Sequence, residues 1–385
     1  MKGRRLFEMT KKLMIISGMW RSKLMEGSHL TKTLYLAYSI LVQFLYATHL
    51  LSYIINFYLL YSENFDDTIE NISKMLYVML ILVKVILCQS RGLMELVEIA
   101  GSEEVSLENS GDVSMRMIYG YHRKQFYKIM YTIVSYTVTL FFKLSILGIQ
   151  NSYRSNKLYK HVNETVGKPL PLSMWFPFDE NRYHYLALTY QVVQLFWTAL
   201  FTVTVYAVSN SLAIFLRAKL KIFQHQLRNL NSNPPDDENE LKMLCLEHKA
   251  IISWSGRLNS SFSWLILLEY SLTSLMLATV LVQIHEGNDE IFHMVYFFLI
   301  FCQLLNICWN ANEIKCESLE LAGALYESRW YDLNQRVKNL LKFMMLKCQS
   351  PLGVNVGPFG ILTTDDANSR LKLAYSFLSI MTGRS

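Results

Sequence analysis

Charged residues are scarce in this 385-residue chain, where Asp, Glu, Lys and Arg together make up 18% of the sequence. A soluble protein usually carries about a quarter. Three kinds of chemical motif are missing as well: a glycine-rich phosphate loop, His and Cys residues at metal-ligand spacing, and a Gly-x-Ser-x-Gly nucleophile turn. We therefore expect no enzymatic activity, no bound metal and no cofactor.

Cysteines are also few, and their positions argue against a disulfide framework. The six are Cys88, Cys245, Cys302, Cys308, Cys316 and Cys348. None falls in a segment that the topology below places outside the cell, where disulfides form and persist. We expect reduced, buried thiols that act as small apolar fillers.

Hydrophobic residues make up 52% of the chain and gather in long blocks. Six blocks suit membrane helices, and a weaker seventh ends the chain: 33–61, 75–89, 126–150, 183–216, 260–284, 291–312 and 363–385. A transmembrane helix needs ~20 mainly apolar residues, whereas barrel strands are short and alternating. The sequence therefore predicts an all-α membrane protein with seven transmembrane helices.

Charge differs between the segments that flank these blocks. Residues 1–32 hold eight Lys and Arg against two acids, whereas residues 62–72 hold four acids and no base. Because basic loops stay in the cytoplasm, we expect a cytoplasmic N-terminus and, after seven crossings, an extracellular C-terminus. Asn71 and Asn163 then lie in outside loops within Asn-x-Ser/Thr sequons, and they are candidate glycosylation sites.

The fourth block is too long for one crossing, since a helix over 183–216 runs ~51 Å against ~30 Å of hydrocarbon. Apolar residues continue beyond it at spacings of three and four, at Leu220, Phe223, Leu227 and Leu230. This spacing indicates a helix seam, which we expect to contact another subunit, with packing inside the same chain as the alternative. Prolines and acids at 232–240 end the helix, and an amphipathic helix follows at 240–256.

The sixth block also runs on past residue 312, and a basic amphipathic helix follows at 331–348. The chain is therefore expected to divide into six parts. They are a cytoplasmic N-terminal segment (1–32), transmembrane helices one to four with a ligand pocket (33–216), a cytoplasmic helical hairpin (217–259), transmembrane helices five and six (260–312), further cytoplasmic helices (313–362) and a last transmembrane helix (363–385).

Three charges stand out within the six strong blocks. Lys84 and Glu269 each sit about two turns from the cytoplasmic end of their helices, where a buried ion pair would relieve two desolvation penalties. Alternatively, Lys84 reaches the interface and Glu269 bonds to a hydroxyl. Lys143 lies near enough to a helix end to reach the outer interface.

Aromatic and small polar residues are mixed in the outer halves of helices two, three, four and six. They are Tyr77, Ile81, Thr139, Phe142, Ile146, Tyr190, Val193, Phe196, Trp197, Tyr296 and Phe297. Hydrophobic and aromatic walls with few hydrogen-bonding groups are typical of small-molecule pockets, so these residues are candidates for ligand binding. Ordinary helix packing is the alternative for each of them taken singly.

The last block is a poor membrane helix. Arg370 and Lys372 lie within it, and a cation surrounded by lipid costs ~2.5–3.5 kcal/mol on insertion scales. We therefore expect this helix to stand inside protein or against water. Ser376, Ser379, Ile380 and Gly383 form one small or polar stripe along it, at spacings of three, four and seven.

Two stretches resemble insect odorant receptors. Residues 169–179 (PLPLSMWFPFD) are similar to the loop before the fourth span of that family. Residues 324–381 resemble the family signature almost throughout, through Tyr326 and Trp330, then Gln349, Pro351 and Gly357 in a linker, and Tyr375-Ser376-Phe377 in the last helix. Insect gustatory receptors, the alternative, usually carry Thr-Tyr and Gln-Phe in that helix. The region between spans four and five is short, unlike that of the shared co-receptor, so the chain resembles an odorant-tuning subunit.

This resemblance implies a ligand-gated, non-selective cation channel in the plasma membrane, with the dendrite of a sensory neuron as the expected place. It implies four subunits around one pore, a heterotetramer with the co-receptor, and a small volatile, mostly apolar ligand. It also implies that the cytoplasmic helices at 313–362 anchor the assembly and that the last helix (363–385) lines the pore. In the last helix it places the hydrophobic gate at Ile380 and the outer mouth at Gly383 and Arg384. A metabotropic seven-span receptor is the main rival, but Asp-Arg-Tyr and Asn-Pro-x-x-Tyr are absent. A transporter would show repeated halves, which the sequence lacks.

Overall fold

The structure, a computed structural model, describes residues 5–20, 28–61, 65–162, 170–180, 182–230, 237–287, 290–328 and 330–382. In chain order its helices are α1 (Leu6–Ile16), α2 (His29–Leu60), α3 (Phe65–Cys88), α4 (Arg91–Asn109), α5 (Val113–Val162), α6 (His184–Arg228), α7 (Asp237–His285), α8 (Glu290–Glu327), a 3-10 turn η2 (Trp330–Asp332), α9 (Gln335–Cys348) and α10 (Thr364–Thr382). The only β pairing among the described residues is an isolated bridge between Asn355 and Ile361. The predicted all-α class is confirmed.

Six helices in the described part of the chain are long and apolar enough to cross a membrane: α2, α3, α5, α6, α7 and α8. They coincide with the six strong hydrophobic blocks of the sequence. α10 occupies the weak seventh block, with 19 residues and two acids, Asp365 and Asp366, in its first turn. The described part of the chain therefore has six helices that suit a membrane and a seventh of mixed polarity.

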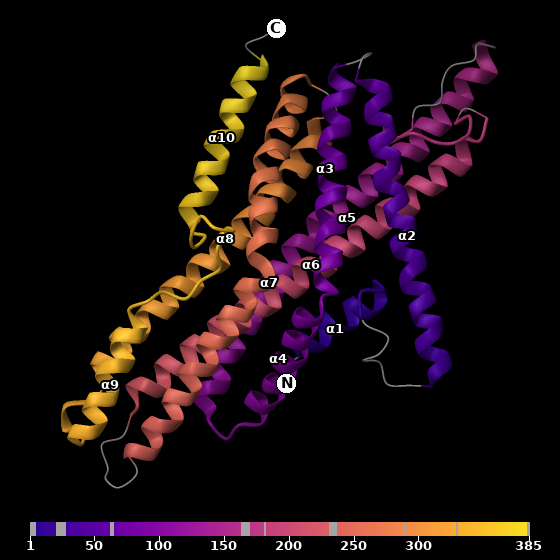
Figure 1. The fold of residues 1–385 in the computed structure, drawn as a ribbon. Coiled ribbons are helices and arrows are strands. Elements are labelled where there is room, and N and C mark those ends of the chain that lie inside the picture. The colour runs from indigo at the N-terminus through magenta and orange to yellow at the C-terminus, as the bar shows by residue number, and fades with distance from the viewer. Residues whose placement is uncertain are drawn as a thin grey trace.

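Successive long helices run in opposite directions, so their ends gather at two ends of the molecule (Figure 1). The C-terminal ends of α2, α5, α7 and α10 lie at one end, and the C-terminal ends of α6 and α8 lie at the other, together with α9. We call the second end the α9 end. The helix ends that flank the segments predicted to lie outside the cell thus share one end, and the C-terminal ends of α6 and α8, predicted to be cytoplasmic, share the α9 end.

The long helices extend well beyond a bilayer. α6 has 45 residues and is ~68 Å long at ~1.5 Å per residue. The predicted continuations of the fourth and sixth helices are therefore confirmed, since α6 runs to Arg228 and α8 runs to Glu327. The amphipathic helix expected at 240–256 and the fifth membrane span form one unbroken helix, α7.

The seam on the last turns of α6 is filled by the chain itself, which corrects the expectation that it contacts another subunit. Leu220, Phe223 and Leu227 are fully buried. α8 runs alongside, and Gln224 Nε2 donates to the Glu317 carbonyl at 2.7 Å. A seam spacing shows that a helix has a partner, but it does not say whether that partner belongs to the same chain.

Two shorter helices, α1 and α4, complete the core although neither forms a hydrophobic block. Leu6 and Phe7 of α1 are buried, and Phe7 packs edge-to-face on Phe215 of α6 with ring centroids 5.3 Å apart. The Glu104 carboxylate of α4 accepts the backbone N–H groups of Leu6 and Phe7 at 2.7 and 3.0 Å. Because the first N–H groups of a helix lack intrahelical partners, this carboxylate caps α1.

The linker between α9 and α10 is fixed to the helices that it crosses. The Leu352 N–H donates to Ser318 Oγ at 2.9 Å, and the Gly357 N–H donates to the Ser263 carbonyl at 3.0 Å. Gly357 has a φ of +52°, a left-handed conformation that glycine adopts without a Cβ penalty. These bonds set where α10 begins.

Candidate functional site

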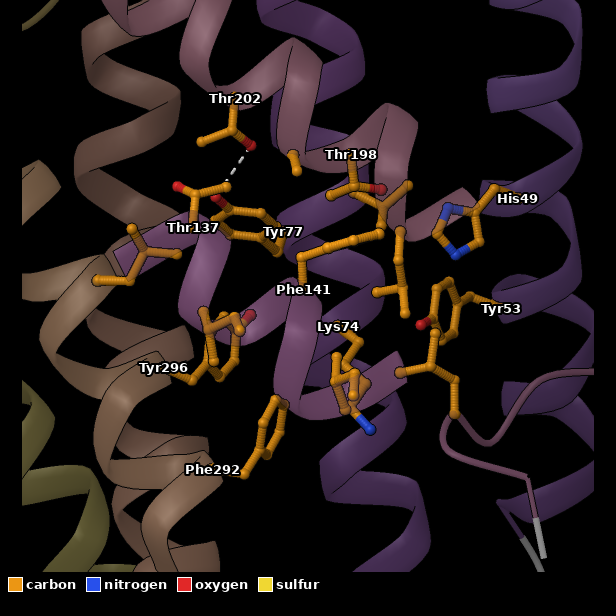
Figure 2. A pocket seen from close by; sticks show the side chains of 17 residues that line it. His49, Tyr53, Lys74, Tyr77, Thr137, Phe141, Thr198, Thr202, Phe292 and Tyr296 are labelled. Carbon is orange, nitrogen blue, oxygen red and sulfur yellow. Dashed lines mark hydrogen bonds between the residues drawn. The ribbon is translucent and has the colours of Figure 1, made fainter. Parts of the chain in front are cut away.

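A cavity of about 90 Å³ lies among α2, α3, α5, α6 and α8, nearer the end away from α9. One water needs ~10–15 Å³ measured in the same way, so this space is large enough for a small organic molecule. The wall is formed by His49, Tyr53, Lys74, Tyr77, Val78, Thr137, Leu140, Phe141, Leu144, Leu172, Leu195, Thr198, Ala199, Thr202, Phe292, Tyr296 and Leu299 (Figure 2). The wall is largely aromatic and aliphatic, which suits an apolar ligand.

Helical periodicity brings these wall residues together. On α5 the lining positions Thr137, Leu140, Phe141 and Leu144 follow spacings of three, one and three, so they share one face of the helix. Leu172, in the connection before α6, adds to the wall from outside the helices. The site is therefore formed only when five helices and this connection are packed.

Hydroxyl groups in the wall are mostly occupied by the protein. The Tyr77 and Thr202 oxygens are 3.1 Å apart within one hydrogen bond, drawn in Figure 2. Tyr296 Oη donates to the Ser73 carbonyl at 3.4 Å. Lys74 forms an ion pair with Glu70, one helical turn earlier.

His49 is different, because its imidazole is only 1% exposed and neither ring nitrogen has a hydrogen-bond partner among the described residues. Figure 2 shows the ring at one side of the cavity, beside Tyr53. A buried polar group without a partner is destabilising, by ~1–3 kcal/mol. His49 is therefore available to hydrogen-bond a bound molecule.

A buried polar cluster continues from the cavity toward the α9 end. Gln303 Nε2 donates to Tyr77 Oη at 3.2 Å, and Gln303 Oε1 lies 3.1 Å from Tyr206 Oη. Tyr206 Oη donates to Glu269 Oε1 at 2.7 Å. Lys84 Nζ contacts the same carboxylate oxygen at 2.5 Å, so the predicted ion pair between Lys84 and Glu269 is confirmed.

The next residue on α7 connects this cluster to α10. Tyr270 Oη donates to Asp366 Oδ1 at 3.2 Å, and the Arg370 guanidinium lies 3.5 Å from the centroid of the Tyr270 ring. Asp366 Oδ2 also accepts the Thr363 N–H at 2.8 Å, at the start of α10. Side-chain contacts thus run from the cavity wall to Glu269 and from Tyr270 to the base of the last helix, and the two sets are joined by the backbone of α7.

The structure brings two of the predicted ligand-binding residues, Tyr77 and Tyr296, into the cavity wall. Nine others do not line it. Ile81 is buried elsewhere in the core, Tyr190, Trp197 and Phe297 are half-buried, and Thr139, Phe142, Ile146, Val193 and Phe196 are exposed, among them Phe142 by 56% and Phe196 by 50%.

The physical reason is that a membrane helix is apolar on every face. Its hydrophobic pattern does not separate side chains that face lipid from those that face a cavity. The sequence had one signal for a missed wall residue, since His49 is the only titratable group other than tyrosine in the first block. For Tyr53, Phe141 and Phe292 the sequence offers no such signal.

The predicted pore residues lie on α10 where the chain leaves it uncovered. Ser376, Ser379 and Ile380 are exposed, whereas Ala367 and Ala374 on another face are buried. α10 packs against α7 and α8 and stands at the side of the bundle in Figure 1. Gly383 and Arg384 lie outside the described residues.

The structure describes one of the two candidate glycosylation sites. Asn163 lies outside the described residues. The Asn71 side chain is fully buried in α3, and its Nδ2 donates to the Ser173 carbonyl at 3.3 Å. A glycan requires an exposed amide nitrogen, so the prediction for Asn71 does not fit this structure.

These features define a multi-pass α-helical membrane protein with an internal, largely apolar cavity. The family model described as 7tm Odorant receptor matches residues 64–364, well over half of the sequence. The chain belongs to this family of odorant receptors.

Individual relatives agree with this assignment. Odorant receptor 10 of Aedes albopictus is 28% identical over 224 residues, which are 55% of this chain and 60% of that protein. Odorant receptor 82a of Drosophila melanogaster is 28% identical over 208 residues, 51% of this chain and 53% of the relative. The match thus spans about half to three fifths of these relatives.

The fold is also that of a solved insect receptor. The olfactory receptor OR5 from Machilis hrabei in complex with eugenol has a TM-score of 0.78, with 16% sequence identity and 98% of each chain covered. A second structure of the same receptor also gives a TM-score of 0.78, with 15% identity over 97% of this chain and 96% of the other. At these identities the likeness shows the fold.

Proposed function

We propose that this chain is the odorant-binding subunit of a ligand-gated, non-selective cation channel. In this proposal a small volatile, mostly apolar molecule occupies the cavity around His49 and Tyr296, and a tetrameric pore lined by α10 opens. Family membership, the aromatic cavity and the uncovered face of α10 with its two serines support it. The single observation that carries the binding role is the imidazole of His49, buried beside empty space without a partner among the described residues.

Ligand affinity arises mainly from burial of apolar surface, at roughly 25 cal/mol per Å². The ligand's polar group hydrogen-bonds His49, which selects molecules that carry one such group on an apolar body. The relative OR5 was solved in complex with eugenol, which supports a small-molecule role for this cavity. Tyr77, Phe141, Phe292 and Tyr296 form the aromatic wall around the ligand.

Opening requires that occupancy of the cavity favours a different position of α10. The route that we propose follows the polar cluster, from Tyr77 through Gln303 and Tyr206 to Glu269. The neighbouring Tyr270 then acts on Asp366 at the base of α10. Every step on this route is a direct contact between side chains or between adjacent residues of one helix.

In the assembled channel we place Ile380 at the hydrophobic constriction, with Ser376 and Ser379 on the same uncovered face. Gly383 and Arg384 remain the residues that we predict at the outer mouth of the pore. A ring of isoleucines that widens and admits water is a known form of hydrophobic gate. The exposed serines offer hydroxyl groups to permeating cations.

We further propose that the co-receptor of the family completes a heterotetramer in the plasma membrane, with the α9 end in the cytoplasm. The outer side of α9 exposes Leu340, Phe343 and Leu346 between lysines, which suits contact with another subunit. The divisions at 217–259 and 313–362 then form one cytoplasmic anchor built from the ends of α6, α7 and α8 together with α9.

The test is to express the chain with the co-receptor and to record currents against an odorant panel. His49→Leu keeps the side chain's bulk without its nitrogens, so half-maximal activation by hydrogen-bonding odorants should need about tenfold more ligand. Tyr296→Ala should change the rank order of odorants. Phe142→Leu is the matched control, since Phe142 is exposed and lies outside the cavity wall. Changes confined to maximal current in all three variants would contradict the binding role.

A further inference from the structure

A second cavity lies on the far side of the polar cluster, between α6, α7 and α8. It encloses about 50 Å³. Its walls include Ala213, Phe262, Leu265 and Ile307, and Val354 of the linker before α10 closes it. It shares no lining residue with the cavity around His49.

One wall of this second cavity carries a carboxylate with a free oxygen. Glu269 is 5% exposed, and all the contacts from Lys84 and Tyr206 end on its Oε1. No hydrogen bond from a described residue reaches Oε2. Glu269 is nevertheless a lining residue, so a strong acceptor borders an otherwise apolar space.

The other polar groups in the wall are occupied. Asn310 Nδ2 donates to Asn210 Oδ1 at 3.0 Å, and Asn210 Nδ2 donates to the Tyr206 carbonyl at 2.8 Å. Ser209 Oγ donates to the Val205 carbonyl at 3.0 Å. The unmet requirement of this cavity is thus a hydrogen-bond donor for Glu269.

We propose that the second cavity is a binding site for a small neutral alcohol, whose hydroxyl donates to Glu269 Oε2 while its carbon chain fills the apolar remainder. A neutral ligand fits better than an amine because Lys84 already balances the Glu269 charge at 2.5 Å. A second buried cation would have no anion to offset its loss of hydration. An alkane fills the same volume but leaves the carboxylate oxygen without a donor.

This site has a direct route to α10 that does not use the first cavity. An occupant touches Val354, whose carbonyl accepts the N–H of Leu362 at 2.9 Å, two residues before α10. Binding of the alcohol in this cavity therefore shifts the position of α10. The alcohol acts as a modulator and not as the primary odorant. The binding claim itself does not rest on the proposed channel activity.

Photolabelling of the purified full-length chain in lipid nanodiscs tests the proposal. The probe is octan-1-ol that carries a diazirine, and adducts are mapped by mass spectrometry. We expect adducts on Glu269 and Phe262 that excess octan-1-ol abolishes, and separate adducts around Tyr296, because the apolar probe also enters the first cavity. Octyl methyl ether, which lacks the donor, should compete about tenfold more weakly.

Matched alanine variants on one helix separate the two cavities. Ala213→Leu fills the second cavity and Ala199→Leu fills the first, fourteen residues earlier on α6. Ala213→Leu should remove the adducts at Glu269 and Phe262 and keep those around Tyr296, which also shows that the variant is folded. Ala311→Leu should do the same from α8. Ala199→Leu should give the reverse pattern.

Three results would overturn the proposal: adducts at Glu269 that survive Ala213→Leu and Ala311→Leu, equal competition by the alcohol and the ether, or labelling confined to the first cavity and the lipid-facing surface. Since the readout is binding, a chain that conducts no current still gives a decisive answer.

Discussion

Lys84 and Glu269 show what a buried charge requires in a membrane protein. Both side chains are almost fully enclosed, and each is the other's only partner of opposite charge among the described residues. Tyr206 contributes a hydroxyl between them, since it accepts from Lys84 at 2.8 Å and donates to Glu269 at 2.7 Å. The sequence indicated the pair from two charges at similar depth, but the tyrosine bridge needed the packed structure.

Removal of one partner should be costly. Lys84→Met leaves the Glu269 carboxylate buried without its counter-charge, and the expected loss of stability is about 3–5 kcal/mol. The measurement is thermal unfolding of the purified chain in detergent. The double variant Lys84→Met/Glu269→Gln should recover most of this loss, because no charge is left unpaired. Equal melting of Lys84→Met and the wild-type chain would show that the pair does not stabilise the fold.

The cysteines differ in accessibility. Cys348 is buried, its Sγ lies 3.7 Å from His248 Nε2, and burial raises the pKa of its thiol to about 12. Cys316 is exposed. Because the thiolate is the reactive form, Cys348 should stay unlabelled by maleimide at pH 7–8 while Cys316 reacts. Peptide mapping after short labelling measures this, with denatured protein as the control. Fast labelling of Cys348 in the folded chain would contradict the described packing of α9.

At the scale of single helices, α10 differs from the six clear membrane helices. It buries one narrow face, including Ala367 and Ala374, and leaves the rest uncovered. Its position is fixed at its base, where Asp366 contacts Tyr270 and the start of the helix itself. A helix held by one narrow face and by contacts at its base suits a part that moves.

Ile380 and Ile86 make a matched pair for a test of the pore. Both are 58% exposed isoleucines, but Ile86 is on α3, away from the uncovered face of α10. With the co-receptor present, Ile380→Glu should give leak current without ligand, because a carboxylate ring wets the constriction. Single-channel recording measures this. Ile86→Glu is the control for a new charge on an exposed face. No change in leak, conductance or block for Ile380→Ala and Ile380→Glu would remove α10 from the pore.

The orientation of the whole molecule across the membrane can be tested at its two chain termini. With the α9 end in the cytoplasm, a tag after Ser385 lies outside the cell. It should therefore bind antibody on intact cells, whereas a tag before Met1 should bind only after permeabilisation. A metabotropic seven-span receptor has the reverse arrangement. Staining of the C-terminal tag only after permeabilisation would favour that rival.

Several features of the fold follow from the sequence alone. Block lengths and hydropathy predicted six strong membrane helices and a weak seventh, since a span must be long and apolar whatever surrounds it. The overlong fourth block predicted a helix that leaves the membrane, and α6 does continue to Arg228. The motif at 324–381 indicated the family before any packing was considered.

Only the tertiary structure decided which side chains face the cavity. Thr139 and Phe142 were indistinguishable in sequence from Thr137 and Phe141, yet only the second two line it. The apolar pattern of a membrane helix has no polar face to mark direction, so neighbours from other helices settle it. For the same reason the seam at Leu220–Leu230 gave no sign that its partners lie in the same chain, where Phe223 stacks on His248 of α7. Composition and length determined the helices, and packing between distant segments determined the site.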